Sequence, residues 1–371
     1  MADTSRNASK EGPRLNAILE ERARSAGGAL PWEAWMSAAL YEPGHGYYAR
    51  RVRQPGRGGD FSTAATISEA LGRAIATWAL RRARELRVRG KLNLVEIGAG
   101  GGQLAETVLK HLGWAGRWRC TYSIVEVSAP LREAQQERLA GRGVRWFSDP
   151  AAAMQALGGR ALVFSNELVD AFPCLILKRE APREGGTGWQ ELWLQPAPSL
   201  ECGWEQVWLP VRRETLMRAA ASSLLTSAAK LAEGQVIEVH AAYREWLYQW
   251  APGLLQGAFL TIDYGSEVAD LYHRRPRGTL RGYFQHLPQH GPEVYARAGH
   301  QDLTADVNFT DLRAWGEESG LTTVSLQSQR DFIFQHAPKL AAGLQTYGDN
   351  MVLNPLGAGE AFHVLEQVAK S

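Results

Sequence analysis

The apolar positions of this chain follow two different periods, which replace one another from segment to segment. Short, mainly apolar runs, typical of strands buried on both faces, occur at residues 92–97, 122–127, 144–147 and 161–164. Segments with apolar residues three and four positions apart, typical of amphipathic helices, lie before and between them at residues 67–86, 104–112 and 131–139. This alternation predicts an α/β fold with a doubly wound, mostly parallel sheet.

The segments around this core have other patterns. Helical spacing at residues 14–25, followed by a second apolar segment at 32–40, predicts an N-terminal helical region. Residues 174–209 change to short, tryptophan-rich strands with turns, which indicates an inserted hairpin region. The remaining expected elements are helices at 214–231, 241–250 and 311–319, strands at 257–263, 321–328 and 362–368, and a loop at 299–309. The predicted domains are an N-terminal helical region at 14–90, a core at 91–173 and 235–371, and an inserted β/α subdomain at 174–234.

Composition narrows the class of protein. The 371 residues carry 41 Lys and Arg against 39 Asp and Glu, so a net charge of +2 gives no reason to expect a nucleic-acid partner. No apolar run approaches the roughly 18 residues of a membrane span. Cys120, Cys174 and Cys202 are odd in number and widely spaced, which indicates neither a disulfide framework nor a metal cluster. We expect a soluble protein without a metal, in a reducing compartment.

One strand-to-helix junction has a pattern that suits a ligand. The apolar run at residues 92–97 is followed by Gly98, Gly100 and Gly102, and Glu96 lies two residues before the first glycine. Glycine tolerates positive φ and lets a ligand touch the main chain. The junction is therefore a candidate site for a nucleotide-like cofactor, with an ordinary strand-to-helix turn as the alternative.

Two further positions refine the type of cofactor. A dinucleotide fingerprint needs a small residue at position 103, where this chain has Gln103, so the pattern argues against a nicotinamide cofactor. Glu126 ends the next strand, and an acid at this place can accept both hydroxyls of a ribose. Together they indicate a cofactor with one nucleoside.

Longer strings narrow the family. They are Gly-Asp-Phe-Ser-Thr-Ala at 59–64, Val-Glu-Val-Ser at 125–128, Asn-Glu-Leu-Val-Asp-Ala-Phe-Pro at 166–173, Ile-Asp-Tyr-Gly at 262–265, Thr-Leu-Arg-Gly-Tyr at 279–283 and Asp-Leu-Thr-Ala-Asp-Val-Asn-Phe at 302–309. With the glycine turn and Glu126, they resemble the MidA-like family of class I S-adenosylmethionine-dependent methyltransferases. The resemblance implies a Rossmann-like sheet, S-adenosyl-L-methionine as cofactor and methyl transfer as the reaction. Because the family includes a mitochondrial arginine methyltransferase that assists assembly of respiratory complex I, it also implies an arginine of a protein partner as the acceptor.

The resemblance assigns residues to the cofactor. Glu96 and the glycine turn are expected to hold the methionine end, Glu126 and Val127 the ribose. Asp149, after the third strand, is a candidate for binding the adenine amine, with a helix N-cap as the alternative role. Asn166 completes this set at the end of the fourth strand. The resemblance also implies a lid over the cofactor, formed by Gly59, Asp60, Phe61, Ser62 and Thr63.

Asn166, Glu167 and Asp170 are the candidate catalytic residues, since open α/β sheets bind ligands outside the carboxyl ends of their strands. An arginine side chain has a pKa of ~12.5 or more, so its deprotonation at neutral pH would cost roughly 7 to 9 kcal/mol. A carboxylate must therefore assist. On a helical turn, Glu167 and Asp170 would share a face and clamp a guanidinium. The alternative is a helix-start motif in which the acids cap backbone amides.

Other titratable residues are candidates for the same cleft. Asp263, Asp302 and Asp306 either line it or brace loops, and His240 and His286 are either proton acceptors or structural residues.

Two positions depart from the family pattern. Ala65-Thr66 replace the usual Pro-Glu, and Asn308 replaces the usual Asp, so two expected carboxylates are missing near the acceptor. Two other functions therefore stay open. One is methylation of a small molecule, with the tryptophan-rich insertion closing the pocket, and the other is a cofactor-binding assembly factor with little turnover. We expect a cytoplasmic protein if the chain is bacterial, and one of the mitochondrial matrix if it is eukaryotic.

Overall fold

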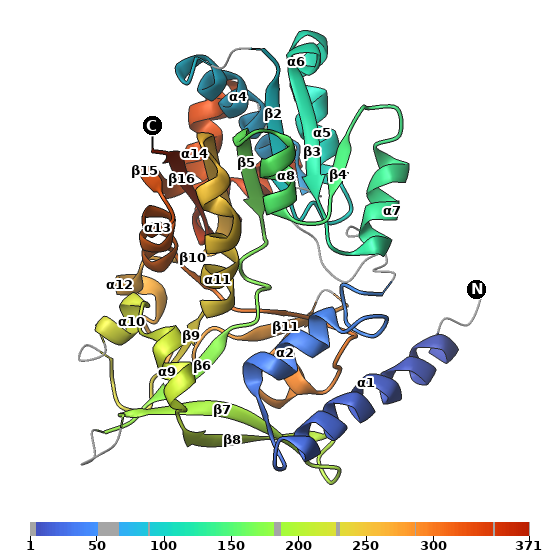
Figure 1. Ribbon diagram of the computed structural model, residues 1–371, viewed down its shortest axis with the longest axis vertical. Helices are drawn as coiled ribbons and strands as arrows, with labels where there is room; N and C mark the ends of the chain where they lie inside the picture. The colour runs from blue at the N-terminus through green and yellow to red at the C-terminus, as the bar shows by residue number, and fades with distance from the viewer. Residues whose placement is uncertain are drawn as a thin grey trace. The chain divides into compact units, whose positions relative to one another are not determined.

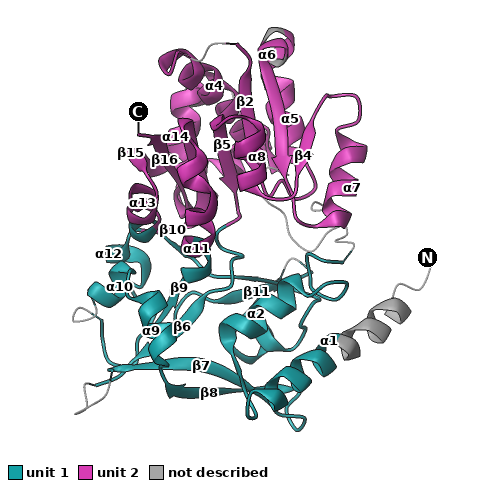
Figure 2. Cartoon of the chain, viewed as in Figure 1, with its two compact units in different colours: residues 1–52, 169–243, 267–311 teal, residues 53–168, 244–266, 312–371 magenta. Residues whose placement is uncertain are grey.

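The computed structural model describes residues 5–50, 67–87, 90–181, 187–227, 231–285, 287–343 and 346–370. The chain divides into two compact units, coloured separately in Figure 2. The insertion unit comprises residues 1–52, 169–243 and 267–311, and the sheet unit comprises residues 53–168, 244–266 and 312–371. These units cut across the predicted domain boundaries, since the N-terminal helices and residues 267–311 group with the inserted strands.

The sheet unit is built on a largely parallel sheet with the strand order β15-β16-β10-β5-β2-β3-β4 (Figure 1). The parallel strands are β2 Leu92–Ile97, β3 Cys120–Val125, β4 Arg145–Phe147, β5 Arg160–Asn166 and β10 Gln256–Ser266. The edge is completed by β15 Leu321–Ser328 and by β16 Phe362–Ala369, which is antiparallel to both of its neighbours. The doubly wound, mostly parallel sheet predicted from the sequence is confirmed.

The order of the strands determines where a ligand can bind. The chain starts in the middle of the sheet at β2, runs outward through β3 and β4, and then returns to the other side of β2 with β5 and β10. The direction of winding therefore reverses between β2 and β5. Ligands of open α/β sheets bind outside the carboxyl ends of the strands at such a reversal.

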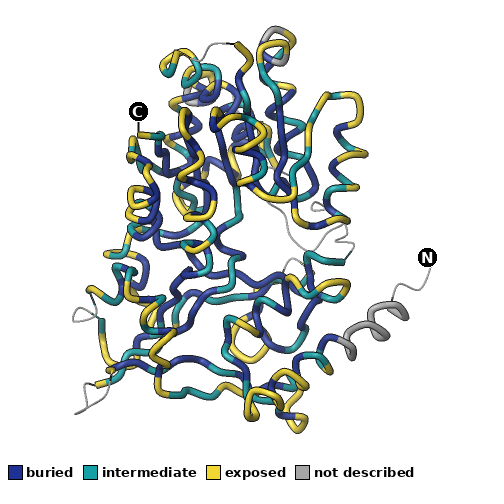
Figure 3. The backbone as a smooth tube through the Cα atoms, viewed as in Figure 1, coloured by how far each residue is buried: buried dark blue, intermediate teal, exposed yellow. Residues whose placement is uncertain are grey.

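Helices cover both faces of this sheet. They are α4 Ala70–Glu85, α5 Gln103–His111, α6 Gly113–Arg119, α7 Ala129–Arg138, α8 Pro150–Ala156, η2 Ala251–Gly253, α14 Gln329–His336, α15 Pro338–Ala341, α16 Tyr347–Val352 and α17 Ala358–Ala361. Apolar residues of α4, α5 and α14 share one core with the strands. On the opposite face, Trp250 of α11 (Ala241–Trp250) lies edge-on to Phe259 of β10, with ring centroids 5.1 Å apart. Figure 3 shows the resulting burial of the central strands, which explains their mainly apolar sequence.

The insertion unit has two smaller sheets. In the first, β1 Leu30–Pro31, β7 Trp189–Pro196, β6 Leu175–Arg179 and β9 Val236–Val239 lie in this order, and β8 Trp204–Pro210 pairs with β7. The second has the order β12-β11-β13, with β11 Arg281–Phe284, β12 Leu287–Gln289 and β13 Asp302–Thr304. Its other elements are α1 Ser5–Ser25, α2 Trp32–Tyr41, α9 Arg213–Ala219, α10 Ser223–Thr226, α12 Val268–Leu271, η3 Gly291–Tyr295 and β14 Val307–Asn308. The helix α13 Phe309–Glu318 continues from this unit into the sheet unit.

Two local predictions were wrong. The helix expected at 214–231 is divided into α9 and α10, because Asp311 accepts a hydrogen bond from Ser223 N at 2.7 Å and Ser222 caps the second helix. The loop expected at 299–309 contains β13 and β14. Within the part of the chain that the structure describes, no helix is both long and apolar enough to cross a bilayer.

Candidate functional site

The glycine turn follows β2 as predicted. Gly98, Gly100 and Gly102 have φ values of 72°, 51° and 79°, a region that strongly favours glycine. Gly98 N donates to Val125 O at 3.0 Å, which fixes the turn to the end of β3. The turn therefore lies at the carboxyl edge of the sheet, where the winding reverses.

The glycines differ in what surrounds them. A Cβ added to Gly98 would lie 2.7 Å from Leu168 Cδ1, whereas one added to Gly100 would meet nothing within 4 Å. Gly98 is thus constrained by packing inside the sheet unit. The Cα of Gly100 instead faces open space on the side where a Cβ would stand, and a cofactor can use this space.

These surroundings predict different effects of alanine. Each substitution should cost ~1 to 2 kcal/mol through the left-handed backbone, and Gly98→Ala should cost more because it also displaces Leu168. Gly100→Ala should mainly weaken cofactor binding. Urea unfolding and calorimetry of both variants measure the two effects, and equal losses of affinity and stability in both would contradict this division.

Glu96 is almost completely buried behind the turn, with 2% of its surface exposed. Tyr122 OH donates to Glu96 Oε2 at 2.6 Å. Burial raises the pKa of Glu96 to about 7, the hydrogen bond from Tyr122 opposes this, and the nearby Glu126 adds to it. Near neutral pH, this carboxylate can therefore change its charge state when a cation such as an α-ammonium group arrives.

Glu126 directly follows β3 and is 5% exposed. Its Oε1 accepts from Ser128 N at 2.9 Å and its Oε2 accepts from Gln135 Nε2 at 2.9 Å. Burial raises its pKa, while these hydrogen bonds and the charge of Arg132 lower it. A carboxylate has about four acceptor positions, and Ser128, Gln135 and the backbone of Val127 use three of them, so Glu126 keeps capacity to accept from a ribose hydroxyl.

The other predicted cofactor residues have different surroundings. Val127 is 74% exposed and offers an apolar surface next to Glu126 that suits the flat face of an adenosine. Asp149 is exposed and accepts from Ala152 N at 2.8 Å as the N-cap of α8, which is the alternative role that the sequence left open. The lid residues Gly59 to Thr63 lie outside the described residues.

Asn166 is the last residue of β5, and Glu167 directly follows it beside the glycine turn. Asn166 Nδ2 donates to Glu167 Oε1 at 3.0 Å, and Glu167 N donates to Ile262 O at 3.0 Å. Glu167 has a φ of 52°, which is uncommon for a residue with a side chain. The parallel pairing of β5 with β2, and the contact of Leu168 with Gly98, place Asn166 and Glu167 at the edge of the sheet where the cofactor is expected.

The helical turn predicted for residues 167–170 does not form. These residues make a bend after β5, because Asp263 Oδ2 in β10 accepts a hydrogen bond from Leu168 N at 3.2 Å. Glu167 and Asp170 therefore do not share a helix face. Asp170 belongs to the insertion unit, where its Oδ2 accepts from Thr304 Oγ1 at 2.8 Å.

The remaining acids brace loops. Asp302 accepts from Tyr48 OH at 2.8 Å, and Asp306 accepts from Arg281 NH1 at 2.6 Å.

His240 is buried, and burial lowers its pKa to about 4, so it is neutral at physiological pH. His286 lies outside the described residues. Across those residues, no group of three or more His, Cys, Asp or Glu side chains is arranged to bind a metal ion.

Sequence reasoning missed side chains that hold the glycine turn from α7. Gln135 Nε2 donates to Gly100 O and Arg138 Nε donates to Gly101 O, both at 2.8 Å. A signal was present, since Gln135 lies four residues from both Leu131 and Leu139 on the apolar stripe of this helix. A polar residue on such a stripe requires a buried partner.

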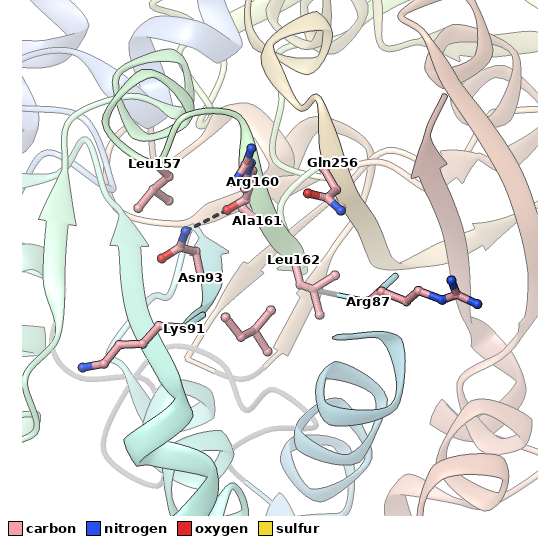
Figure 4. A pocket seen from close by; sticks show the side chains of 10 residues that line it. Arg87, Lys91, Asn93, Leu157, Arg160, Ala161, Leu162 and Gln256 are labelled. Atoms are coloured by element: carbon pink, nitrogen blue, oxygen red, sulfur yellow. Dashed lines mark hydrogen bonds between the residues drawn. The ribbon is translucent and has the colours of Figure 1, made fainter. Parts of the chain in front are cut away.

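A separate pocket of about 420 Å³ lies at the opposite, amino edge of the same sheet (Figure 4). Its lining includes the first residues of β2, β5 and β10, and the cations Arg87, Lys91 and Arg160. In Figure 4 the side chains of Arg87 and Lys91 extend in opposite directions. The pocket is therefore distinct from the glycine-turn edge and does not gather its cations around one ligand.

The sheet order, the glycine turn, Glu96 within β2 and Glu126 directly after β3 define a class I methyltransferase that uses S-adenosylmethionine. The model of a family described as "Putative S-adenosyl-L-methionine-dependent methyltransferase" matches residues 74–327. The chain belongs to this family, and S-adenosylmethionine is its cofactor.

Similar proteins support this assignment. A Danio rerio protein named protein arginine methyltransferase NDUFAF7, mitochondrial, is 26% identical over 373 residues, covering 91% of this chain and 83% of its own. The Mus musculus protein of the same name is 27% identical and covers 91% and 80%. A Burkholderia thailandensis protein crystallised with S-adenosyl-homocysteine has a TM-score of 0.84 and 26% identity, covering 99% of this chain and 94% of its own.

Proposed function

We propose that this chain transfers the methyl group of S-adenosylmethionine to an arginine side chain of a protein partner. The observation that carries the proposal is Glu167, held at a φ of 52° directly after β5. A residue with a side chain keeps such a backbone only where its surroundings determine it, and such residues cluster at active sites. Hydrogen bonds from Glu167 N to Ile262 O and from Leu168 N to Asp263 provide that determination.

The chemistry requires a carboxylate at this place. S-adenosylmethionine supplies the electrophilic methyl group. Glu167 would accept hydrogen bonds from a guanidinium, orient one nitrogen toward the methyl group and accept the proton that this nitrogen loses on methylation. S-adenosylhomocysteine would leave as the second product. Asn166 would fix the Glu167 carboxylate through its 3.0 Å hydrogen bond. Orientation of two bound partners can contribute ~7 to 11 kcal/mol of the barrier.

One departure from the family pattern is consistent with the proposal. Asn308 is 3% exposed, donates to Ser223 Oγ at 2.9 Å and accepts from Thr310 N at 3.1 Å. An aspartate there would add a second negative charge near Asp311, whose pKa burial already raises. Asn308 therefore has a structural role within the insertion unit that an amide fills well. The Danio rerio and Mus musculus relatives are named mitochondrial protein arginine methyltransferases, which supports a protein acceptor and, for a eukaryotic chain, a mitochondrial location.

Methyl-labelled S-adenosylmethionine tests the proposal. The purified chain is incubated with labelled cofactor and an undermethylated extract of its own organism, and labelled products are identified by mass spectrometry. We expect label in methylarginine of a protein, and none with the Glu167→Gln variant. Label in the low-mass fraction would instead identify a small-molecule methyltransferase. Tight cofactor binding without any label would identify an assembly factor.

A further inference from the structure

Side chains of the helix α7 form hydrogen bonds to the glycine turn and to Glu126 of the candidate cofactor site. Three of its side chains reach out of the helix: Arg132 NH2 donates to Glu126 O at 2.7 Å, Gln135 bonds the glycine turn and Glu126, and Arg138 Nε donates to Gly101 O at 2.8 Å. The two parts of the cofactor site come from different strands, β2 and β3. A rigid connection between these parts is therefore supplied by α7.

Gln135 is the centre of this connection because its side-chain amide makes three hydrogen bonds, which include both of its N–H donors. Gln135 is 0% exposed, and its Nε2 donates to Gly100 O at 2.8 Å and to Glu126 Oε2 at 2.9 Å. Its Oε1 accepts from Trp146 Nε1 at 3.0 Å. An amide has two N–H donors, and both are engaged here. Since Trp146 can only donate, it fixes which end of the amide faces the carboxylate.

The hydrogen bond from Gln135 Nε2 stabilises the charged form of the Glu126 side chain. Glu126 is desolvated, and a buried carboxylate without hydrogen-bond donors tends to take up a proton. The charge of Arg132 from α7 lowers the pKa of Glu126, and Glu126 in turn raises the pKa of Glu96 from β2. Gln135 and Ser128 N add neutral donors that favour the ionised carboxylate. An ionised Glu126 is a stronger acceptor for ribose hydroxyls than a protonated one.

We propose that Gln135 is a positioning residue that clamps the carboxylate of Glu126 to the carbonyl of Gly100 and thereby sets cofactor affinity without touching the cofactor. The proposal rests on the assignment of Glu126 to the ribose. Gln135 acts on two parts of the site at once, so its loss releases both. Its orientation depends in turn on Trp146.

Calorimetry with S-adenosylhomocysteine tests the proposal on the full chain. Gln135→Met keeps the length of the side chain and removes all three hydrogen bonds, and we expect affinity to fall ~10- to 100-fold. Gln136→Met is the matched control, because Gln136 is the exposed neighbour on the same helix, and it should bind like the wild type. Trp146→Phe keeps a ring but releases the amide, and it should give an intermediate loss. If Gln135→Met does not fold, the affinity of the Trp146→Phe variant tests the proposal in its place.

The route of the effect is tested by a double variant. If Gln135 acts through Glu126, the losses of cofactor affinity caused by Gln135→Met and Glu126→Ala should be less than additive in the double variant. The cofactor-free variants should melt at the temperature of the wild type, so that a loss of stability does not explain the lost affinity. Wild-type affinity in folded Gln135→Met and Trp146→Phe, or strictly additive losses, would overturn the proposal. Wild-type affinity in Glu126→Ala would instead overturn the ribose assignment.

Discussion

The Glu167→Gln variant is expected to lose methyl transfer by ~10² to 10⁴-fold while it keeps its affinity for S-adenosylmethionine. Glutamine preserves the size of the side chain and the hydrogen bond from Asn166, which is 3.0 Å long in the wild type. It removes the negative charge that an arginine acceptor requires. Turnover and calorimetry on the same preparation separate the chemical step from cofactor binding.

Two outcomes would contradict this role. Near-normal turnover would exclude Glu167 from the chemical step. A lower melting temperature with unchanged activity would show that Glu167 only braces the bend after β5. The variant Asp170→Asn is the companion measurement, because Asp170 belongs to the other unit and already accepts from Thr304. Additive losses in the double variant would show that the two acids act independently.

The Glu96→Gln variant is expected to make the cofactor-free protein more stable above neutral pH and to weaken cofactor binding. Burial raises the folded-state pKa of Glu96 from 4.5 to about 7, so the folded protein retains a proton that the unfolded chain loses. Wild-type stability therefore falls as pH rises from about 4.5 to 7, by up to ~3 kcal/mol from this group. Glutamine cannot ionise and avoids this loss.

Urea unfolding at pH 5 and pH 8 measures the effect. The stability of Glu96→Gln relative to the wild type should rise by ~2 to 3 kcal/mol between these pH values. Its affinity for S-adenosylmethionine at pH 8 should fall ~10- to 100-fold, because a neutral amide attracts the α-ammonium group less than a carboxylate does. Glu137→Gln, at an exposed position of α7, is the control and should change neither quantity. A variant less stable than the wild type at pH 8 would contradict the effect of burial.

The parts of the site that depend on local sequence could be predicted. Gly98, Gly100 and Gly102 take positive φ because the turn itself demands it, and Glu126 ends a strand that is visible as an apolar run. The doubly wound order also follows from the alternation of strands and helices. The expected α/β class and the family resemblance both rest on such local patterns.

Contacts between distant segments could not be predicted. The bend at residues 167–170 depends on Asp263, which is nearly a hundred residues away in the chain, so local spacing alone favoured a helix. Gln135 was missed for a similar reason, since its partners Glu126, Gly100 and Trp146 come from three different segments. Asp149 was ambiguous because a carboxylate before a helix serves equally well as an N-cap and as a ligand.

The central claim is that the carboxyl edge of β2 and β3 binds S-adenosylmethionine. Isothermal titration calorimetry of the wild type and of Glu126→Ala with S-adenosylmethionine, and of the wild type with NAD, tests it most directly. We predict micromolar binding of S-adenosylmethionine, none of NAD, and a loss of ~1.5 to 3 kcal/mol in Glu126→Ala. Micromolar binding of NAD without binding of S-adenosylmethionine, or unchanged binding by Glu126→Ala, would contradict it.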